Sequence, residues 1–288
     1  PAGAHTGDRV FPIPELTDEM LEEIRLDDGS IDEWYDLVGE PVMTPLDFQD
    51  HPRGNRLADP AELDFRIWLA WHDDPDRLYV AFVSSDDEYS NSHDYDGKSR
   101  LLEHDSIALA IDGDHRGGHG GVDITAPEDW GDFHGQAQLY EAVSRTVTGL
   151  PTLNAPDILR QTGSFSWTVS PPYGDGGGGV AGENPTVSVI ELYVTPYDFW
   201  EGWDSGPGET AFSDLAAGKG IGFAVMVYDW DETTGSWEYF TAIQTERPYT
   251  DMVDLRADVF LDGLLLPANP EGTAVEGSTW GRIKATLR

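Results

Sequence analysis

The segment from Ser92 to Glu103 has the residue types and spacing of a calcium-binding loop. Counted from Ser92, the carboxylates Asp94, Asp96 and Glu103 occupy the third, fifth and twelfth places, and Gly97 occupies the sixth. Short carboxylates at alternate positions can converge on one hard cation, glycine permits the sharp turn, and the last glutamate can bind through both oxygens. Because the flanking residues read as strands, the loop is not an EF-hand. We predict calcium here, with a solvated acidic loop as the alternative.

Further acidic clusters follow other apolar runs. One is Asp112 and Asp114 with Asp123, a second surrounds Asp229, and Asp105 is close enough in sequence to join the first loop together with the acidic residues 86–88. In a chain with 54 acidic residues such spacings also arise by chance. The candidate calcium ligands are Asp94, Asp96, Glu103, Asp105, Asp112, Asp114, Asp123, Asp229 and Asp231.

The charge balance restricts the partners of this chain. Its 54 acidic and 17 basic residues give a net charge of −37. Such a field repels nucleic acid and anionic membranes and attracts divalent cations. Adaptation to a salty environment explains the same acidity, and both interpretations can hold together. The absence of cysteine excludes disulfides and Cys-based zinc or haem attachment.

Short apolar runs separated by turn signals predict an all-β fold that positions these loops. We expect one large β-sandwich with a jelly-roll-like or immunoglobulin-like course and long acidic loops. The runs Leu78–Glu88 and Asp105–Asp114 suggest a hairpin-like unit, and the stretch Gly174–Gly182 suggests a flexible loop. The candidate strands are Asp64–Trp71, Arg77–Ser84, Asp105–Ile111, Gln136–Thr148, Phe165–Val169, Thr186–Val194, Ile221–Tyr228, Trp237–Gln244, Ala257–Leu261 and Trp280–Leu287.

The first 26 residues differ from the remainder. Residues 1–26 read as an extended arm and a short helix capped by Thr17, and residues 27–288 read as the sandwich domain. The strand-like part of the arm, Arg9–Ile13, could add to the sheet edge of a neighbouring molecule. No apolar run reaches membrane-spanning length, and a start at Pro1 fits removal of a leader. We therefore expect a secreted, extracellular or periplasmic protein.

Aromatic residues offer a site for sugar. A sugar-binding surface needs exposed aromatic rings for stacking, with carboxylates that bind hydroxyl groups. Trp200 and Trp203, beside Asp198 and Glu201, are the best pair, although most tryptophans in a sandwich belong to its core. The sequence contains neither a nucleophile elbow nor a Gly-rich phosphate loop. We therefore expect a protein that is not an enzyme.

Several segments, taken in order, resemble family 9 carbohydrate-binding modules and their DOMON-like relatives. The resemblance spans residues 27–288. The segments that carry it are Asp28-Gly-Ser-Ile-Asp-Glu-Trp34, Ile67-Trp-Leu-Ala-Trp-His-Asp-Asp74, Leu78-Tyr-Val-Ala-Phe82, Asp105-Ser-Ile-Ala-Leu-Ala-Ile-Asp112, Val189-Ile-Glu-Leu-Tyr-Val194, Gly220-Ile-Gly-Phe-Ala-Val-Met-Val-Tyr-Asp229 and Thr279-Trp-Gly-Arg-Ile-Lys284. The resemblance implies a β-sandwich with structural calcium and, in some relatives, sugar binding. The insertions at 86–104, 113–135 and 171–185 depart from a minimal module.

Three functional hypotheses follow. The first is an exported, calcium-stabilised module that recognises a glycan or a cell-surface polysaccharide. The second is a self-assembling extracellular subunit of a filament, tube or sheath, with calcium at protomer contacts and the N-terminal arm as a connector. The third, suggested by DOMON-like relatives that bind haem, is an electron-transfer subunit.

Overall fold

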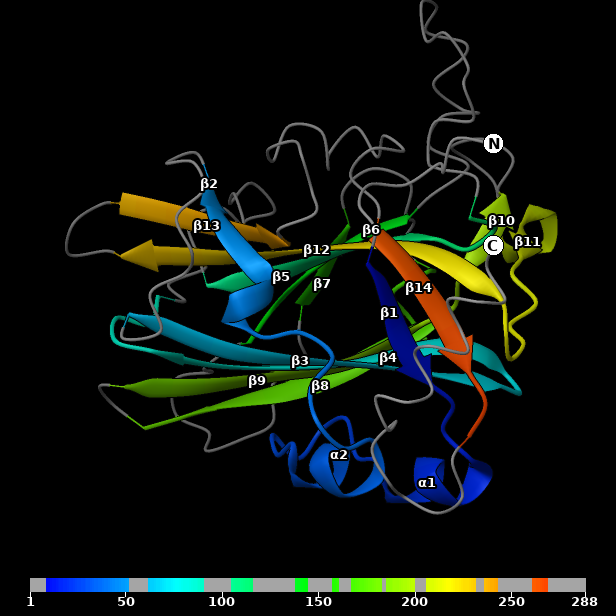
Figure 1. The fold of residues 1–288 in the computed structure, drawn as a ribbon, viewed down its shortest axis with the longest axis horizontal. Coiled ribbons are helices and arrows are strands. Elements are labelled where there is room, and N and C mark those ends of the chain that lie inside the picture. The colour runs from blue at the N-terminus through cyan, green and yellow to red at the C-terminus, as the bar shows by residue number, and fades with distance from the viewer. Residues whose placement is uncertain are drawn as a thin grey trace, which may run out of the picture.

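Two stacked β-sheets, with two short helices beneath one of them, form the protein (Figure 1). The computed structural model describes residues 9–51, 62–90, 105–115, 138–144, 157–160, 167–182, 185–199, 206–231, 236–242 and 261–268. Apolar side chains from both sheets make up the main core between them. This architecture confirms the predicted all-β sandwich.

The larger sheet has eight strands and is organised around one long strand, β12. Its strands in spatial order are β1 (Val10–Pro14), β14 (Leu261–Leu266), β12 (Gly220–Asp231), β5 (Ser106–Asp112), β6 (Gln138–Val143) and β7 (Asp157–Arg160), with β13 (Ser236–Ala242) and β2 (Phe48–His51) continuing from β12. The first part of β12 pairs with β14 and its last part with β13, while β5 pairs along its other edge. A separate pair consists of β10 (Tyr197–Phe199) and β11 (Ala211–Phe212).

The smaller sheet has four antiparallel strands and is buried on both faces. Its strands in spatial order are β3 (Leu63–Asp73), β4 (Asp76–Asp86), β9 (Thr186–Val194) and β8 (Gly174–Ala181). Because successive side chains of a strand point to opposite faces, Ile67 and Leu69 enter the main core, whereas Trp68 and Ala70 face outward. The same alternation places Ile190, Leu192 and Val194 inward, and Glu191 and Tyr193 outward.

The N-terminal segment covers that outer face. Its helices are α1 (Asp18–Glu23) and α2 (Asp32–Leu37), and short 3-10 helices η1 (Pro45–Asp47) and η4 (Pro207–Glu209) occur elsewhere. Leu16, Trp34 and Trp68 belong to a second core between these helices and the sheet (Figure 1). Thr17 caps α1 through its hydroxyl, which accepts from the amide of Met20 at 3.3 Å, so the predicted capped helix is confirmed.

Segment Arg9–Ile13 has a partner within its own chain. Strand β1 lies parallel to β14, with Val10 opposite Asp262, and the Phe11 and Ile13 side chains enter the main core. The burial of these two apolar side chains stabilises the pairing.

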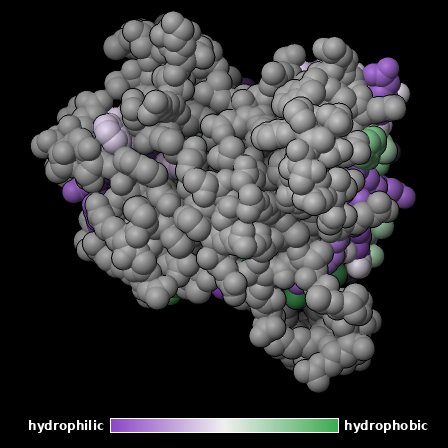
Figure 2. Space-filling view, turned by 90° about the horizontal axis from the view of Figure 1, so that it is seen from above, coloured by the Kyte–Doolittle hydropathy of each residue, from purple (hydrophilic) through white to green (hydrophobic). Residues whose placement is uncertain are grey.

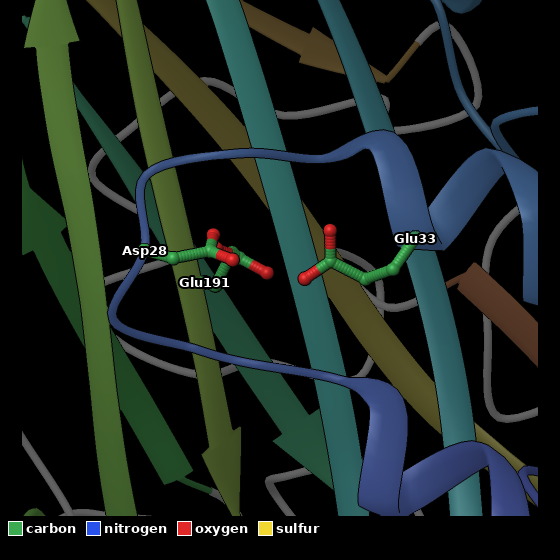
Figure 3. Close-up of side chains that lie close together, drawn as sticks. All are labelled: Asp28, Glu33 and Glu191. Carbon is green, nitrogen blue, oxygen red and sulfur yellow. The ribbon is translucent and has the colours of Figure 1, made fainter.

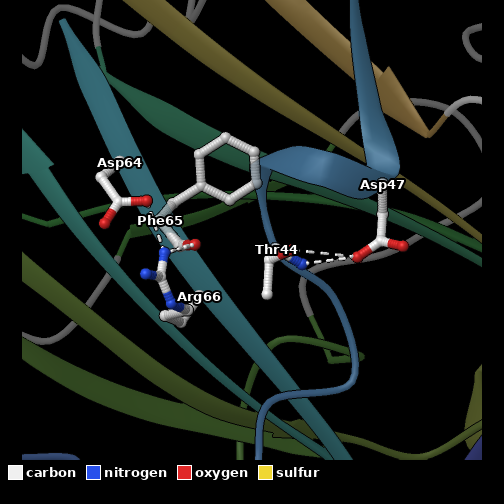
Figure 4. A network of polar contacts seen from close by, with 5 residues as sticks. All are labelled: Thr44, Asp47, Asp64, Phe65 and Arg66. Atoms are coloured by element: carbon white, nitrogen blue, oxygen red, sulfur yellow. Dashed lines mark hydrogen bonds and ion pairs between the residues drawn. The ribbon is translucent and has the colours of Figure 1, made fainter. Parts of the chain in front are cut away.

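Two local polar contacts fix the chain around the start of β3. The amide of Thr44 donates to Asp47 Oδ2 at 2.9 Å, which closes η1 (Figure 4). The guanidinium of Arg66 donates to the carboxylate of Asp64 and to the carbonyl oxygen of Phe65.

Neither described α-helix has the length and apolar character that crossing a membrane requires. In the view of Figure 2, the described residues that reach the surface lie mainly along one side, where hydrophilic and hydrophobic residues are interspersed.

The predicted hairpin of β4 and β5 is wrong. These two strands belong to different sheets: β4 pairs with β3 and β9, and β5 pairs with β12 and β6. Every residue of β5 is buried, and such a strand requires a neighbour on each side. The segment predicted as a strand at Phe165–Val169 forms turns at residues 167–169. The predicted strand at Trp280–Leu287 lies outside the described residues.

The predicted flexible loop at Gly174–Gly182 is also wrong, because its glycines form strand β8. They leave room for the N-terminal segment, which crosses this strand. A Cβ atom on Gly177 would lie only 1.9 Å from the carbonyl oxygen of Leu26. Gly29, in the same crossing segment, has a φ of +69°, a conformation that glycine adopts without strain. Close backbone packing therefore explains the glycine run.

Candidate metal centre

Three buried aspartates from distant parts of the sequence meet at one end of the sandwich. Asp86 ends β4 in the smaller sheet, Asp105 immediately precedes β5, and Asp229 lies in β12 of the larger sheet. Their exposed fractions are 1%, 6% and 2%. One carboxylate oxygen from each lies within 4.8 Å of the others. This aspartate triad therefore brings carboxylates of the two sheets together.

Backbone amide groups hold two members of the triad in place. The carboxylate of Asp105 accepts from the amide of Ser90 at 2.5 Å and from the amide of Trp230 at 2.8 Å. The carboxylate of Asp86 accepts from the amide of Glu88 at 2.8 Å. These bonds orient the carboxylates before any ligand arrives.

The electrostatics of the triad favour a bound positive charge. Burial raises the pKa of the Asp105 carboxyl well above its ordinary value, and the neighbouring Asp86 and Asp229 raise it further. Hydrogen bonds from the backbone act in the opposite direction. Three adjacent carboxylates in a buried site require protons or a cation to offset their repulsion.

The donor set fits a hard divalent cation. Calcium binds carboxylate oxygens at about 2.3–2.6 Å, so that ligands on opposite sides of the ion lie about 4.6–5.2 Å apart. The triad oxygens lie 4.8 Å or less from one another, which is close enough for one ion to contact all three. Asp86, Asp105 and Asp229 would hold such an ion, and the ion would supply charge neutralisation and a cross-link between the sheets.

The structure joins candidate ligands that the sequence assigned to separate clusters. Asp105 and Asp229 meet, and the third member, Asp86, comes from the opposite sheet. Asp112 and Asp114 lie at the other end of β5, about 20 Å or more from Asp105 at the usual rise per residue. Other candidates cannot be placed: Asp94, Asp96, Glu103 and Asp123 lie outside the described residues, and Asp231 is described only in its backbone.

The predicted sugar-binding pair, Trp200 and Trp203, lies outside the described residues, and so does the adjacent Glu201. Asp198 is described in β10. Its carboxylate accepts a hydrogen bond from the hydroxyl of Ser213 and lies 3.9 Å from Nζ of Lys219. Asp198 therefore has two polar partners within its own chain, and the sugar site remains a prediction.

A second acidic cluster was not predicted from the sequence. Asp28, Glu33 and Glu191 bring one oxygen each within 4.8 Å of the others, on the outer face of the smaller sheet (Figure 3). Glu191 is fully buried at 0% exposure, and its Oε1 accepts from Nε1 of Trp34 at 2.7 Å. Burial raises the pKa of Glu191 to about 8. The signal in the sequence is a lone glutamate within the apolar run Val189–Val194.

The fold resembles that of two solved carbohydrate-binding modules. A family 9 module from Caldicellulosiruptor kristjanssonii in complex with cellotriose aligns with a TM-score of 0.51 at 10% identity, covering 93% of this chain and 98% of the module. A family 9 module from the same organism in complex with glucose aligns with a TM-score of 0.50 at 10% identity, covering 93% and 100%. No protein-family model and no curated protein sequence matches the chain. The two structural likenesses show that the chain has the β-sandwich fold of family 9 modules, as the resemblance in sequence implied.

Proposed function

We propose that this protein is a non-catalytic, extracellular module that recognises carbohydrate and is stabilised by calcium. The observation that supports recognition is the likeness to two modules solved with cellotriose and with glucose, which extends over 93% of the chain. Because one fold can host different functions, this likeness supports a binding function by analogy. Cellotriose and glucose are therefore the first ligands to test.

Calcium at the aspartate triad would act on stability rather than on sugar chemistry. The three ligands come from β4, from the residue before β5 and from β12, so an ion there would connect the two sheets at one end. Bound calcium would offset the repulsion among Asp86, Asp105 and Asp229. A chelator is expected to loosen this end of the sandwich and to leave the opposite end unchanged.

Titration calorimetry with cellotriose and glucose tests the recognition function. We expect binding by the unmodified protein and its loss in Trp200→Ala and Trp203→Ala, because stacking on an aromatic ring supplies much of the affinity for a sugar. Tyr35→Ala is the matched control, since Tyr35 is an exposed aromatic residue, 44% accessible, on α2. Equal affinity in all three variants would contradict the assignment of the sugar site, and a lack of binding to a broad glycan array would contradict recognition itself.

The assembly and haem hypotheses predict different observations. Calcium-dependent polymers in light scattering, lost on deletion of residues 1–15, would support an assembling subunit. The segment Arg9–Ile13 already completes a sheet within its own chain, so it supports assembly less strongly than the sequence suggested. A Soret absorption band after incubation with haem would support electron transfer.

A further inference from the structure

The second acidic cluster gathers three carboxylates from three separate elements. Asp28 is exposed in the loop before α2, Glu33 is half-buried in the first turn of α2, and Glu191 is fully buried in β9. Their oxygens lie within 4.8 Å of one another, and the carboxyl groups of all three point toward a common space (Figure 3). This arrangement joins the N-terminal segment to the outer face of the smaller sheet.

The buried carboxylate of Glu191 lacks a partner on one oxygen. Its Oε1 accepts from Nε1 of Trp34, whereas its Oε2 is buried and has no hydrogen-bond partner among the described residues. An unsatisfied polar atom in a protein interior costs about 1–3 kcal/mol, and more when it is charged. The Glu191 carboxyl group faces Asp28 and Glu33, so the missing partner is a positively charged group or a proton.

The surroundings of Glu191 supply no compensating charge among the described residues. Its neighbours in register are Ala81 on β4 and Gly177 on β8. The charged groups that act on it are Asp27, Asp28 and Glu33, which are all acidic. None of the ion pairs within the described ranges involves the second acidic cluster.

The remaining oxygens of the cluster leave room for metal coordination. The backbone amide of Ser30 donates to Asp28 Oδ1 at 2.9 Å, and that of Arg25 donates to Glu33 Oε1 at 3.3 Å. A carboxylate oxygen accepts more than one such bond, and each of these residues keeps a second oxygen. Oxygen-only donors suit calcium, which takes six to eight oxygen ligands in flexible geometry.

We propose that Asp28, Glu33 and Glu191 bind a divalent cation, with calcium as the preferred ion, which fastens the segment before α2 to the smaller sheet. This site is separate from the aspartate triad. Ala81, which pairs with Glu191, and Asp86 lie five residues apart on β4, about 17 Å along the strand and on opposite faces. The two sites can therefore be tested one at a time.

Trp34 provides a local reporter for this ion. We expect calcium chloride, added to chelator-treated protein, to shift the indole Nε1–H resonance of Trp34 in nitrogen–proton correlation spectra, because that group donates to Glu191. The indoles of Trp68 and Trp71 donate to the carbonyl oxygens of Gly39 and Leu266 and are expected to stay unchanged. The triad variant Asp229→Asn is expected to keep the Trp34 shift.

Charge-removing variants with matched controls decide the proposal. Glu33→Gln and Asp28→Asn change residues that are not buried and are expected to weaken the calcium affinity reported by Trp34 roughly tenfold or more, since affinity follows the number of charged ligands. Glu191→Gln is expected to abolish the shift. Asp36→Asn, an exposed position on the same helix, is expected to leave the affinity unchanged.

Two outcomes would overturn the proposal. One is a Trp34 resonance that responds to pH and not to millimolar calcium, which would mean that a shared proton fills the gap. The other is a calcium shift of equal size in Glu191→Gln. Loss of calcium binding at the triad alone would contradict the stabilising role given above and leave this site intact, so the two failures are distinguishable.

Discussion

Replacement of Glu191 by glutamine should remove a pH dependence that this residue imposes on the stability of the metal-free protein. The pKa of Glu191 rises from 4.5 to about 8 on folding, chiefly because burial disfavours its charge. Between these values the folded protein holds a proton that the unfolded chain has released. The free energy of unfolding therefore falls as the pH rises, by about 3–4 kcal/mol between pH 5 and pH 8 for this one group. Below pH 4.5 the residue is protonated in both states and the effect vanishes.

Glutamine isolates this contribution because its carbonyl oxygen can still accept from Nε1 of Trp34 while the side chain no longer titrates. Urea unfolding, followed by tryptophan fluorescence, would be measured at pH 5, 6, 7 and 8 with chelator and constant ionic strength. The difference in unfolding free energy between Glu191→Gln and the unmodified protein should grow by about 3–4 kcal/mol toward pH 8. Other titrating groups, Asp105 included, are present in both proteins and largely cancel.

A difference that stays constant from pH 5 to pH 8 would refute this reasoning, and a difference of opposite sign would mean that Glu191 is ionised and stabilising without metal. Asp36→Asn serves as the control, because an exposed carboxylate on α2 should give a nearly constant difference over the same range. Saturating calcium should reduce the difference at pH 8, since the bound ion stabilises the ionised form of Glu191.

Two further predictions concern packing and metal. Gly177→Ala should cost about 1–3 kcal/mol of stability in thermal unfolding, because its Cβ would collide with the carbonyl of Leu26, whereas Gly208→Ala, with nothing within 4 Å, should be nearly neutral. Calcium at about one hundred times its dissociation constant should stabilise the protein by about 2.7 kcal/mol per site, or roughly 5 °C in melting temperature. Asp229→Asn should lose the part of this gain that the aspartate triad contributes; a melting response to calcium that is unchanged in Asp229→Asn would contradict that role.

The parts of the fold that were predictable depend on local periodicity. Alternation of apolar and polar residues marked β9 with its observed bounds, Thr186–Val194, and located most of β3, β4 and β12. The cap at Thr17 marked the start of α1 in the same way. These signals are short in range, because side-chain alternation and helix capping involve neighbours within a few residues.

The features that were missed depend on contacts between distant segments. Glycine-rich β8 resembles a loop until the segment that crosses it is known, because nothing local explains why a strand there must lack side chains. The sequence grouped Asp105 with the acidic residues 86–88, but Asp229 follows Asp105 by about 120 residues, so spacing could not show that Asp229 completes the triad. Glu191 carried a signal, a charge within an apolar strand, but its two partners come from about 160 residues earlier in the chain.

The parallel pairing of β1 with β14 has a consequence for how the chain reaches its folded form. The paired residues are about 250 positions apart, so β1 cannot dock until β14 has been synthesised and arranged. Until β1 docks, β14 is an edge strand of the larger sheet, and its unpaired backbone N–H and C=O groups can pair with another chain. The many negative charges along the polypeptide then keep unfinished molecules apart while the last strand closes.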